Sequence, residues 1–431
     1  MRFAFYTLGC KVNQFETQAM ERRVQELGHT VVPFGEPCDC CVVNTCTVTA
    51  VSDKKCRAAV RRAKKLSPDT VVGVCGCYAQ NDPDVIRALG ADVLAGTADR
   101  MEFLDLLISA ADDRQKRETL QPAREHRAFE RLPAGGLAAR TRAVLKVEDG
   151  CNNFCSYCVI PFARGPVRSL PLAAAVDEAR RVCAEGYREL VVTGIEISSW
   201  GQDLPEKPQL ADLIAAVCAS APQLRIRLGS LEPRTVTLAF CERLAGYNNL
   251  CPHFHLSLQS GSDTVLARMR RKYDTARYLE SVALLREFFP GCAVTTDVIV
   301  GFPGETDEEF AETLAFLDTC GFAACHIFPY SRRPGTAADR MAGQLGNAVK
   351  EQRSARAIEA AAKLEDAYLR AMLGRAYDVL WEQPEDGCFA GHTPNYAKVY
   401  IRQDGLHNTV TRCTAVERFR DGLLMRPEET Q

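Results

Sequence analysis

The chain has 431 residues, of which 46% are hydrophobic and 25% are charged, and its formal net charge is -2. A chain of this length exceeds one small hydrophobic core and predicts two or three globular domains. The balanced charge excludes a uniformly basic surface, so any nucleic-acid-binding surface must come from local clustering. No apolar run is long enough to span a membrane, and we expect no membrane partner.

The 20 cysteines are unusually many, and they occur as tight clusters or as single residues inside apolar runs. This pattern favours metal sites in a reducing compartment over disulfides. Leu8-Gly9-Cys10 is similar to a lipoprotein cleavage site, but the apolar run before it is shorter than the ~7–15 residues of a signal core. We therefore expect a cytoplasmic protein.

Residues 1–110 alternate short apolar segments with amphipathic ones, which predicts a small parallel α/β domain. The expected strands are residues 2–8, 29–34, 41–45 and 70–74, and the expected helices are residues 13–27 and 52–66.

Three cysteines of this domain come just after predicted strands: Cys10, Cys46, and either Cys75 or Cys77. The carboxyl ends of parallel strands meet at one edge of a sheet, so these thiols are expected to converge on one site. The spacing alone leaves open the alternative that they are reduced cysteines packing as small hydrophobic side chains.

The predicted helix 52–66 has its apolar residues on one face and a row of basic residues on the other. A solvated face is the simplest interpretation, and a face that contacts phosphates is the alternative hypothesis. The basic residues are Lys54, Lys55, Arg57, Arg61, Arg62, Lys64 and Lys65.

Residues 111–141 show little periodicity and contain several Pro and Gly residues, so we interpret them as a linker. Residues 142–335 then alternate strands and helices over a longer period. This predicts six βα units that form a partial barrel, with functional loops at the carboxyl ends of its strands. The expected strands are residues 143–147, 189–193, 225–228, 253–259, 293–300 and 324–328.

The loop after the first of these strands contains Cys151, Cys155 and Cys158 in a C-x3-C-x2-C spacing. Such spacing suits a soft metal, whereas zinc and four-cysteine iron–sulfur sites need a fourth ligand. The next cysteine, Cys183, is a helix-length away, and the next histidine is His253. Three ligands would leave one coordination position open for chemistry.

The last hundred residues predict a connecting segment, residues 336–372, and a small β-barrel, residues 373–431. Residues 346–372 are rich in Ala, Glu, Lys and Arg and predict one long helix. Short strands are expected at residues 377–381, 396–401 and 423–426, separated by turns that contain Gly387 and Gly405.

Several motifs together resemble the methylthiotransferases, a family of radical S-adenosylmethionine (SAM) enzymes. They are TLGCKVN, NTCTVT, GCYAQ and GCNNFCSYC, and GHTPNYAKVYI resembles the TRAM domain, an RNA-binding β-barrel. The resemblance implies that Cys151, Cys155 and Cys158 hold a [4Fe–4S] cluster that binds SAM. It also implies an auxiliary [4Fe–4S] cluster on Cys10, Cys46 and Cys77, so the GCYAQ motif selects Cys77 over Cys75.

The resemblance further indicates where SAM would bind. The candidate contacts are Tyr157, Ser257, Gln259, Ile299 and Gly301. Gly301 would let the backbone approach a ligand closely. Glu196 follows a strand where many radical SAM enzymes bind the SAM amino group, and its role stays open. Arg164 and Arg168 are either anchors for a phosphate or the SAM carboxylate, or ordinary ion-paired arginines.

TLGCKVNQFET, EDGCNNFCSYC, PFARGPVRS and FPYSRRPGT most resemble the members that act on N6-threonylcarbamoyladenosine at tRNA position 37. These enzymes insert sulfur and a SAM-derived methyl group at C2 of the base. The partners implied are the tRNA anticodon loop and a small electron-transfer protein such as flavodoxin or ferredoxin, with the enzyme as a monomer. The alternatives are an isopentenyladenosine of tRNA as substrate, a ribosomal protein aspartate, or a non-catalytic iron–sulfur RNA-binding protein.

Overall fold

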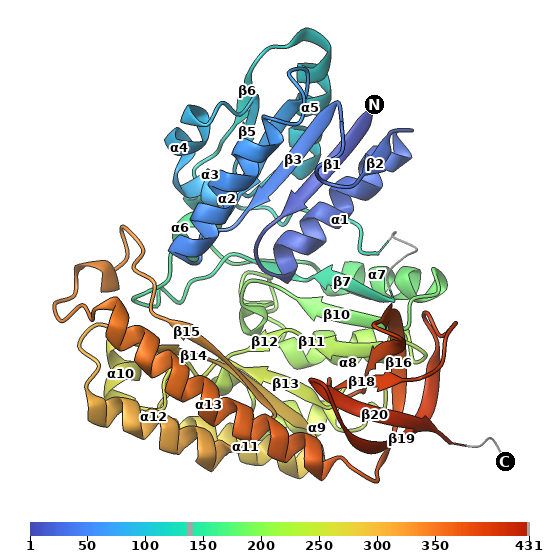
Figure 1. Cartoon of the computed structure of the whole chain (residues 1–431), viewed down its shortest axis with the longest axis vertical. Helices are drawn as coiled ribbons and strands as arrows, with labels where there is room; N and C mark the ends of the chain where they lie inside the picture. Colours follow the sequence, from blue (N-terminus) through green and yellow to red (C-terminus); the bar gives the residue numbers. More distant parts are fainter. Residues whose placement is uncertain (136–140, 429–431) are drawn as a thin grey trace.

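A computed structural model describes residues 1–135 and 141–428 (Figure 1). They form two α/β parts and one all-β part. Residues 136–140 of the predicted linker, and the last three residues of the predicted C-terminal part, lie outside the described residues. The parts follow one another along the chain: an N-terminal sheet with helices, a central partial barrel, and a small closed β-barrel. The predicted fold class is therefore confirmed.

The N-terminal part is a six-stranded parallel sheet in the order β2-β1-β3-β4-β5-β6. Apolar side chains alternate along its strands, so one layer packs around Val43 and Val60 and the opposite layer around Val42 and Phe103. The strands are β1 Arg2–Thr7, β2 Thr30–Val32, β3 Cys40–Thr45, β4 Val71–Gly76, β5 Val93–Ala95 and β6 Arg117–Thr119. The helices are α1 Lys11–Glu26, α2 Ala50–Ala63, α3 Cys77–Asn81, α4 Pro83–Ala88 and α5 Arg100–Asp113.

The sheet continues beyond the expected boundary near residue 110. Strand β6 lies inside the segment predicted as a linker, 111–141, and pairs in parallel with β5 from Arg117 to Thr119. A short 3-10 helix, η1 Ala123–Glu125, follows. The predicted linker therefore contains one short strand. The sequence contains no signal for it, because a three-residue edge strand is too short to show periodicity and is held by main-chain pairing.

The central part contains two parallel sheets, β11-β10-β7 and β12-β13-β14-β15. Strand β11 pairs with β10 and β12 with β13, and only Gly229 separates β11 from β12. The chain therefore passes from one sheet to the next at Gly229. The strands are β7 Arg142–Lys146, β8 Glu148–Asp149, β9 Arg168–Ser169, β10 Glu189–Thr193, β11 Arg225–Leu228, β12 Ser230–Leu231, β13 His253–Leu256, β14 Ala293–Val300 and β15 Ala324–Pro329.

Helices cover the outer face of these strands and share one large apolar core with them (Figure 1). They are α7 Leu172–Ala184, α8 Leu210–Ser220, α9 Leu238–Leu244, α10 Asp263–Arg268, α11 Thr275–Phe288 and α12 Asp307–Cys320. The short helix α6 Ile160–Arg164 instead packs against α3 of the N-terminal part. Three 3-10 helices complete this part: η2 Ile197–Ser199, η3 Pro233–Thr235 and η4 Ala338–Arg340.

The long helix α13 Asn347–Ala371 packs along β15 and leads to a closed barrel of order β16-β17-β18-β20-β19. The barrel lies beside β10 and β11, where Arg227 donates to the Pro394 carbonyl at 2.8 Å. Its strands are β16 Ala376–Glu385, β17 Cys388–His392, β18 Lys398–Ile401, β19 Val410–Phe419 and β20 Gly422–Pro427. Among the residues described, no helix combines the length and apolar character needed to cross a membrane.

Candidate active site

The first thiol triad lies in the loop between β8 and α6. Cys151, Cys155 and Cys158 are all half-buried and reduced. Burial raises the pKa of Cys158 to about 12, and the Cys155 thiol raises it further. Burial also raises the pKa of Cys151, and the Cys158 thiol contributes to that rise. The three thiols are thus close enough to interact.

The loop that carries this triad begins at Gly150, whose φ is +86°. A Cβ at this position would lie 2.1 Å from the Pro166 carbonyl oxygen, so only glycine allows the two ends of the loop to meet.

The second triad forms where three neighbouring strands of the N-terminal sheet end. Cys10 follows β1 and is the N-cap of α1, Cys46 follows β3, and Cys77 begins α3 directly after β4. Burial raises the pKa of Cys46 to about 12, with further contributions from Cys77 and Cys10. Residues far apart in the sequence therefore bring three thiols together, as parallel topology predicts.

Cys75 faces away from this triad. It is fully buried in the apolar layer formed by residues such as Phe3, Val42 and Phe103. The thiol of Cys77 instead interacts with that of Cys10. The geometry therefore favours Cys77 over Cys75 as the third member of the triad.

The two triads face each other across the boundary between the N-terminal and central parts. The Cys77 thiol is among the groups that raise the pKa of Cys158, and α3 packs against α6. The donor sets fit iron–sulfur clusters, because each offers three reduced thiols. A fourth thiol, that of Cys56, lies beside the second triad and donates to the Cys46 carbonyl at 3.3 Å. A bound cation would reverse the effect of burial and favour the thiolates.

A buried charge network lies beneath the triads, centred on Arg164. The Arg164 guanidinium is fully buried and contacts Glu16 Oε1 at 2.5 Å and Asp149 at 3.3 Å. It also donates its Nε–H to Cys77 Sγ at 3.3 Å. Arg168 donates to the Arg164 and Pro166 carbonyls. Of the two interpretations left open by the sequence, the described contacts favour ion-paired arginines.

The candidate SAM contacts divide into two groups. Tyr157 and Ile299 pack in one apolar cluster, next to the first triad. Ser257 and Gln259 belong to the strand end after β13, where the Tyr273 hydroxyl donates to the Ser257 carbonyl. The main chain of Gln259 pairs with β14, its φ being +69°.

Gly301 lies against helix α13 and against Glu305. Its N–H donates to Glu305 Oε2 at 2.7 Å, and a Cβ there would lie 2.6 Å from Cγ of Lys350 on α13. The close approach that needs glycine is therefore that of α13. A ligand at Gly301 remains a prediction.

Arg271 connects the strand end after β13 to the first triad. It donates to Cys155 Sγ at 3.0 Å and to the Tyr273 hydroxyl at 3.0 Å. Glu196 also lies nearby: burial raises the pKa of Glu196 to about 7, Glu232 raises it further, and Arg271 lowers it. Arg271 carries no motif signal, so the sequence did not indicate it.

A cavity of about 640 Å³ lies at the centre of the three parts. Its walls include Cys10 from the N-terminal part, Thr193 and Gly194 from β10 and its loop, and Tyr396 and Lys398 from the C-terminal barrel. The five candidate SAM contacts do not belong to its walls, whereas Cys10 does. The cavity is therefore accessible to a substrate next to the second triad.

Three further side chains inside this cavity were not expected. His255, Asp297 and His326 each bring one potential ligand atom within 4.8 Å of the others. His255 Nε2 lies 3.3 Å from Asp297 Oδ2, and its Nδ1 lies 3.0 Å from Thr295 Oγ1. His255 and Asp297 belong to sequence segments that were singled out as motifs. No pattern in the sequence showed that these two side chains would line the cavity together.

Comparison with known families agrees with this architecture. The model of the Radical SAM superfamily matches residues 145–317, and that of Uncharacterized protein family UPF0004 matches residues 2–96. Among solved structures, the radical SAM methyltransferase TsrM from Kitasatospora setae, with cobalamin and a [4Fe-4S] cluster bound, superposes with a TM-score of 0.57 at 15% identity. The match covers 78% of this chain and 73% of TsrM, and it supports the fold.

Relatives align along nearly the whole chain. Threonylcarbamoyladenosine tRNA methylthiotransferase MtaB from Bacillus subtilis (strain 168) is 39% identical, over 93% of this chain and 90% of the relative. MtaB from Thermotoga maritima is 35% identical, over 94% and 91%. The tRNA-2-methylthio-N(6)-dimethylallyladenosine synthase of Nitratidesulfovibrio vulgaris (Hildenborough) is 34% identical, over 88% and 86%.

The partial barrel with its cysteine loop defines a radical SAM enzyme that carries an additional N-terminal domain and a C-terminal barrel. Within this class, the chain belongs to the family of the threonylcarbamoyladenosine tRNA methylthiotransferases MtaB. The predicted cofactors, SAM and [4Fe–4S] clusters, are those of this family.

Proposed function

We propose that this chain methylthiolates C2 of N6-threonylcarbamoyladenosine at position 37 of tRNA. The observation that carries the proposal is the pair of facing thiol triads, one of which borders a cavity large enough for a modified base. The name of the 39% identical MtaB of B. subtilis supplies the substrate class. An isopentenyl-type adenosine is the competing substrate, because the tRNA-2-methylthio-N(6)-dimethylallyladenosine synthase of N. vulgaris is 34% identical.

The six cysteines of the two triads are the proposed cluster ligands. Cys151, Cys155 and Cys158 would hold the cluster that binds SAM, and Cys10, Cys46 and Cys77 the auxiliary cluster. When bound, such clusters supply one-electron cleavage of SAM and delivery of sulfur. Tyr157, Ser257, Gln259, Ile299 and Gly301 are the proposed SAM contacts.

The protein's own residues position these groups and exclude water. The Arg164 network holds the second triad against the α6 loop, and all its side chains are buried. Arg271 places a positive charge beside Cys155, to whose Sγ it donates at 3.0 Å. Tyr157 of the cysteine loop and Ile299 of β14 both pack against one apolar cluster, which includes Phe302 and Tyr330.

The tRNA would reach the cavity between the N-terminal part and the C-terminal barrel, both of which contribute to its walls. An unpaired anticodon-loop base can be inserted there and recognised by its edges. We further propose that the enzyme is a cytoplasmic monomer and receives electrons from a small protein such as flavodoxin or ferredoxin.

The proposal is tested with the anaerobically reconstituted protein, SAM, a reductant, and two anticodon stem-loop RNAs. One RNA carries N6-threonylcarbamoyladenosine and the other isopentenyladenosine. We expect the 2-methylthio product only with the first RNA, together with 5′-deoxyadenosine. Product with the second RNA alone would assign the other substrate, and deoxyadenosine without either product would point to a protein substrate. Absence of SAM cleavage would identify a non-catalytic iron–sulfur protein.

A further inference from the structure

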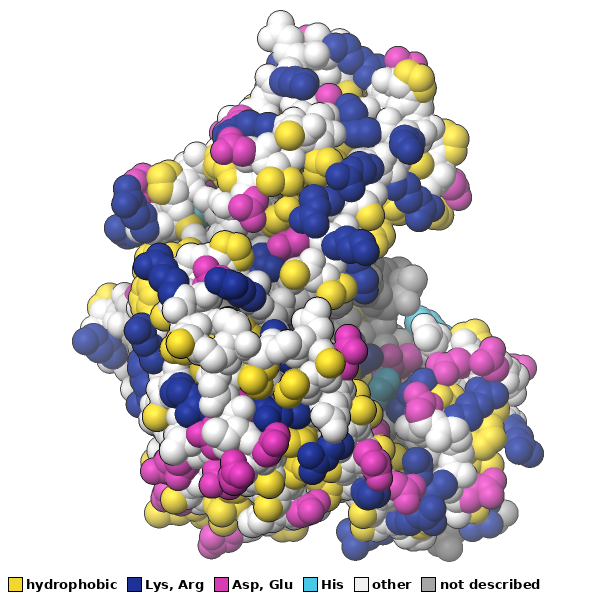
Figure 2. Space-filling model, turned by 60° about the vertical axis from the view of Figure 1, so that its left-hand side comes forward, with side chains coloured by type: hydrophobic (Ala, Val, Ile, Leu, Met, Phe, Trp, Pro, Cys, Tyr) yellow, Lys and Arg dark blue, Asp and Glu magenta, His cyan; other side chains and the backbone are white. Residues whose placement is uncertain are grey.

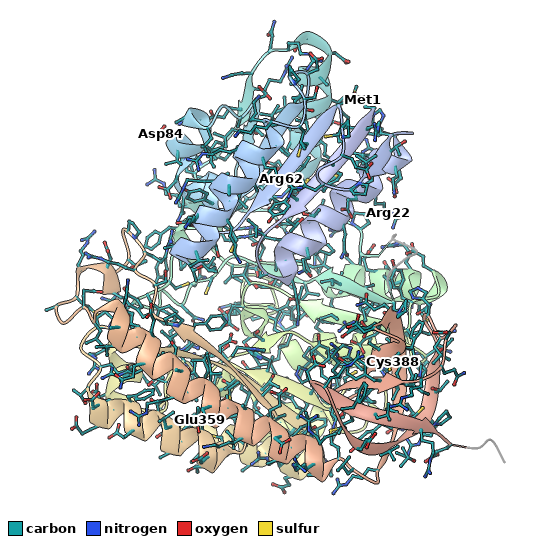
Figure 3. All side chains as sticks on the ribbon, viewed as in Figure 1. Met1, Arg22, Arg62, Asp84, Glu359 and Cys388 are labelled. Atoms are coloured by element: carbon teal, nitrogen blue, oxygen red, sulfur yellow. The ribbon has the colours of Figure 1, made fainter. Side chains whose placement is uncertain are left out.

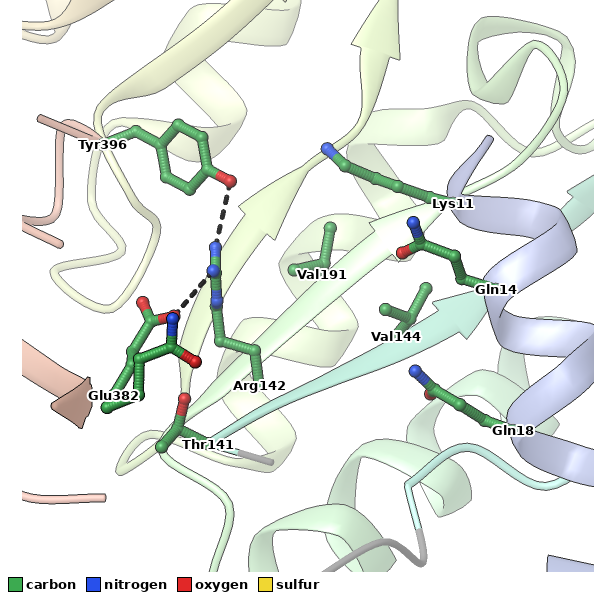
Figure 4. A pocket seen from close by; sticks show the side chains of 10 residues that line it. Lys11, Gln14, Gln18, Thr141, Arg142, Val144, Val191, Glu382 and Tyr396 are labelled. Carbon is green, nitrogen blue, oxygen red and sulfur yellow. Dashed lines mark hydrogen bonds and ion pairs between the residues drawn. The ribbon is translucent and has the colours of Figure 1, made fainter. Parts of the chain in front are cut away.

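A second cavity, of about 370 Å³, adjoins the central one along helix α1 (Figure 4). Lys11, Gln14 and Gln18 form one wall, because positions i, i+3 and i+7 of a helix share a face. Arg142 and Tyr396 lie opposite. Lys11 and Tyr396 also line the central cavity, so a ligand can extend from one cavity into the other.

Lys11 is a cation without a counter-ion in the part of the chain that the structure describes. Its side chain extends into the space that faces Tyr396, whereas Arg142 is bound to the Tyr396 hydroxyl and to Glu382 (Figure 4). Arg142, the other cation of this cavity, is paired with Glu382 at 2.8 Å, so an added anion would pair with Lys11.

The same wall offers one buried hydrogen-bond donor that has no acceptor among the described residues. Gln18 is only 4% exposed, yet its Nε2 has no partner among the described residues. A buried donor without an acceptor is costly, so this position favours a ligand that carries oxygen atoms. In Figure 4 the amide groups of Gln14 and Gln18 extend to the same side as Lys11.

The charges that line the central cavity favour binding of an anion beside Lys11. Asp297, Glu365 and Asp421 line that cavity, and its other lysine, Lys398, is already paired with Asp421 at 3.1 Å. An anionic group would be repelled at those walls and attracted only near Lys11. Lys11 directly follows Cys10, so the anion would lie next to the second triad.

We propose that Lys11 binds the carboxylate of the threonyl group of the substrate base, and that Gln14 and Gln18 donate to its remaining oxygens. This inference rests on the proposed function, in which the base is N6-threonylcarbamoyladenosine. The threonyl group ends in a carboxylate and a hydroxyl, whereas a dimethylallyl group is uncharged and has no acceptor. Lys11 thus determines which modified adenosine is accepted.

The test compares two anticodon stem-loop RNAs that differ in one group: the natural carboxylate, and the carboxamide of the same threonine. Dissociation constants are measured by fluorescence anisotropy for the wild type, Lys11→Gln, Lys11→Arg, and the control Lys363→Gln on the exposed side of α13. SAM cleavage is measured for each variant to show that the protein is folded and loaded.

The wild type and Lys363→Gln should bind the carboxylate RNA about tenfold or more tightly than the carboxamide RNA, as expected for a charged hydrogen bond. Lys11→Gln should bind both RNAs about equally, and Lys11→Arg should keep a preference for the carboxylate.

Two results would overturn the inference: equal binding of both RNAs by the wild type, or a preference that survives in Lys11→Gln. If Lys11→Gln weakens binding of both RNAs by the same factor, Lys11 contacts a phosphate and the inference is wrong. These results leave the proposed function intact, because that function fails only if the wild type does not methylthiolate the carboxylate RNA.

Discussion

The Nε–H of Arg164 donates to the Sγ of Cys77 at 3.3 Å, and this bond joins the two halves of the active site. Arg164 ends helix α6, which follows the first triad, whereas Cys77 belongs to the second triad in the N-terminal sheet. The same guanidinium donates to the Asn13 side chain at 3.0 Å. Arg164 is therefore one of the residues that hold the N-terminal part over the barrel, together with Arg333, which pairs with Asp53.

Replacing Arg164 should loosen this interface. Arg164→Met leaves Glu16 and Asp149 with fewer counter-ions in a buried site, which typically costs about 3–5 kcal/mol. We expect faster hydrogen exchange in α1 and α6 than in the rest of the chain, measured by mass spectrometry. The control, Arg180→Met, removes an exposed arginine from α7. Equal protection in the Arg164 variant and the wild type would show that the network does not hold the parts together.

The two cysteine triads should hold separate clusters. Substituting Ala for Cys10, Cys46 and Cys77 together should lower the iron content from about eight to about four per chain and leave SAM cleavage intact, since the first triad is unchanged. Iron and sulfide analysis after anaerobic reconstitution, with a deoxyadenosine assay, measures both effects. Cys75→Ala is the matched control, because this thiol packs in the apolar layer. Loss of iron in that control would contradict the assignment of Cys77.

The stability of the interface should depend on acid pH through Glu16. Burial by itself would raise the pKa of Glu16, but Arg100, Arg164 and Lys146 lower it to about 2. The unfolded chain takes up this proton near pH 4.5, so the ionised carboxylate stabilises the fold above that pH. The contribution is lost as the pH falls from about 4.5 to 2.

Glu16→Gln should therefore lower the free energy of unfolding at neutral pH and make its decrease between pH 4.5 and 2 less steep. Urea unfolding at a series of pH values measures this slope. Glu26→Gln, at the exposed end of the same helix, should keep the wild-type slope. An unchanged slope in Glu16→Gln would mean that the ion pairs do not survive in solution.

The basic face of α2 should bind tRNA phosphates. Lys54, Lys55, Arg61, Arg62 and Lys65 are exposed, and Lys and Arg side chains spread over the N-terminal part in Figure 2. Arg62, labelled in Figure 3, lies over the Phe34 ring at 5.0 Å. The two remaining basic residues make contacts within the domain, Arg57 with Tyr78 and Lys64 with Asp92.

Reversing Arg61 and Lys65 to Glu should weaken tRNA binding and reduce the slope of log affinity against log salt by about 2. Filter binding at several salt concentrations measures both. The control reverses Lys363 and Arg370, which are exposed on α13. If the variant with Glu at positions 61 and 65 binds tRNA with the wild-type affinity and salt dependence, this basic face contacts only solvent.

Much of the fold could be predicted from the sequence because its signals are local. Strand–helix alternation indicated the two parallel parts, and cysteines just after predicted strands marked the strand ends. Strand β6 was missed because three residues form a strand only beside β5.

The candidate site was predictable only where motifs exist. The six cysteines stand in recognisable motifs, whereas the partners of Arg164 come from α1 and β8, far from it in sequence. Lys11 illustrates the same limit. Its position in a motif was visible in the sequence, but the lack of a counter-ion among the described residues is a property of the folded chain. Pairing of buried charges depends on tertiary contacts that no local pattern records.

The central claim is tested most directly by nucleoside mass spectrometry of tRNA from a strain that lacks this gene and has no second enzyme of the same activity. The account predicts that 2-methylthio-N6-threonylcarbamoyladenosine disappears, that N6-threonylcarbamoyladenosine accumulates, and that the wild-type gene restores the product while a Cys10→Ala gene does not. A normal level of the 2-methylthio nucleoside in the deletion strain would contradict it.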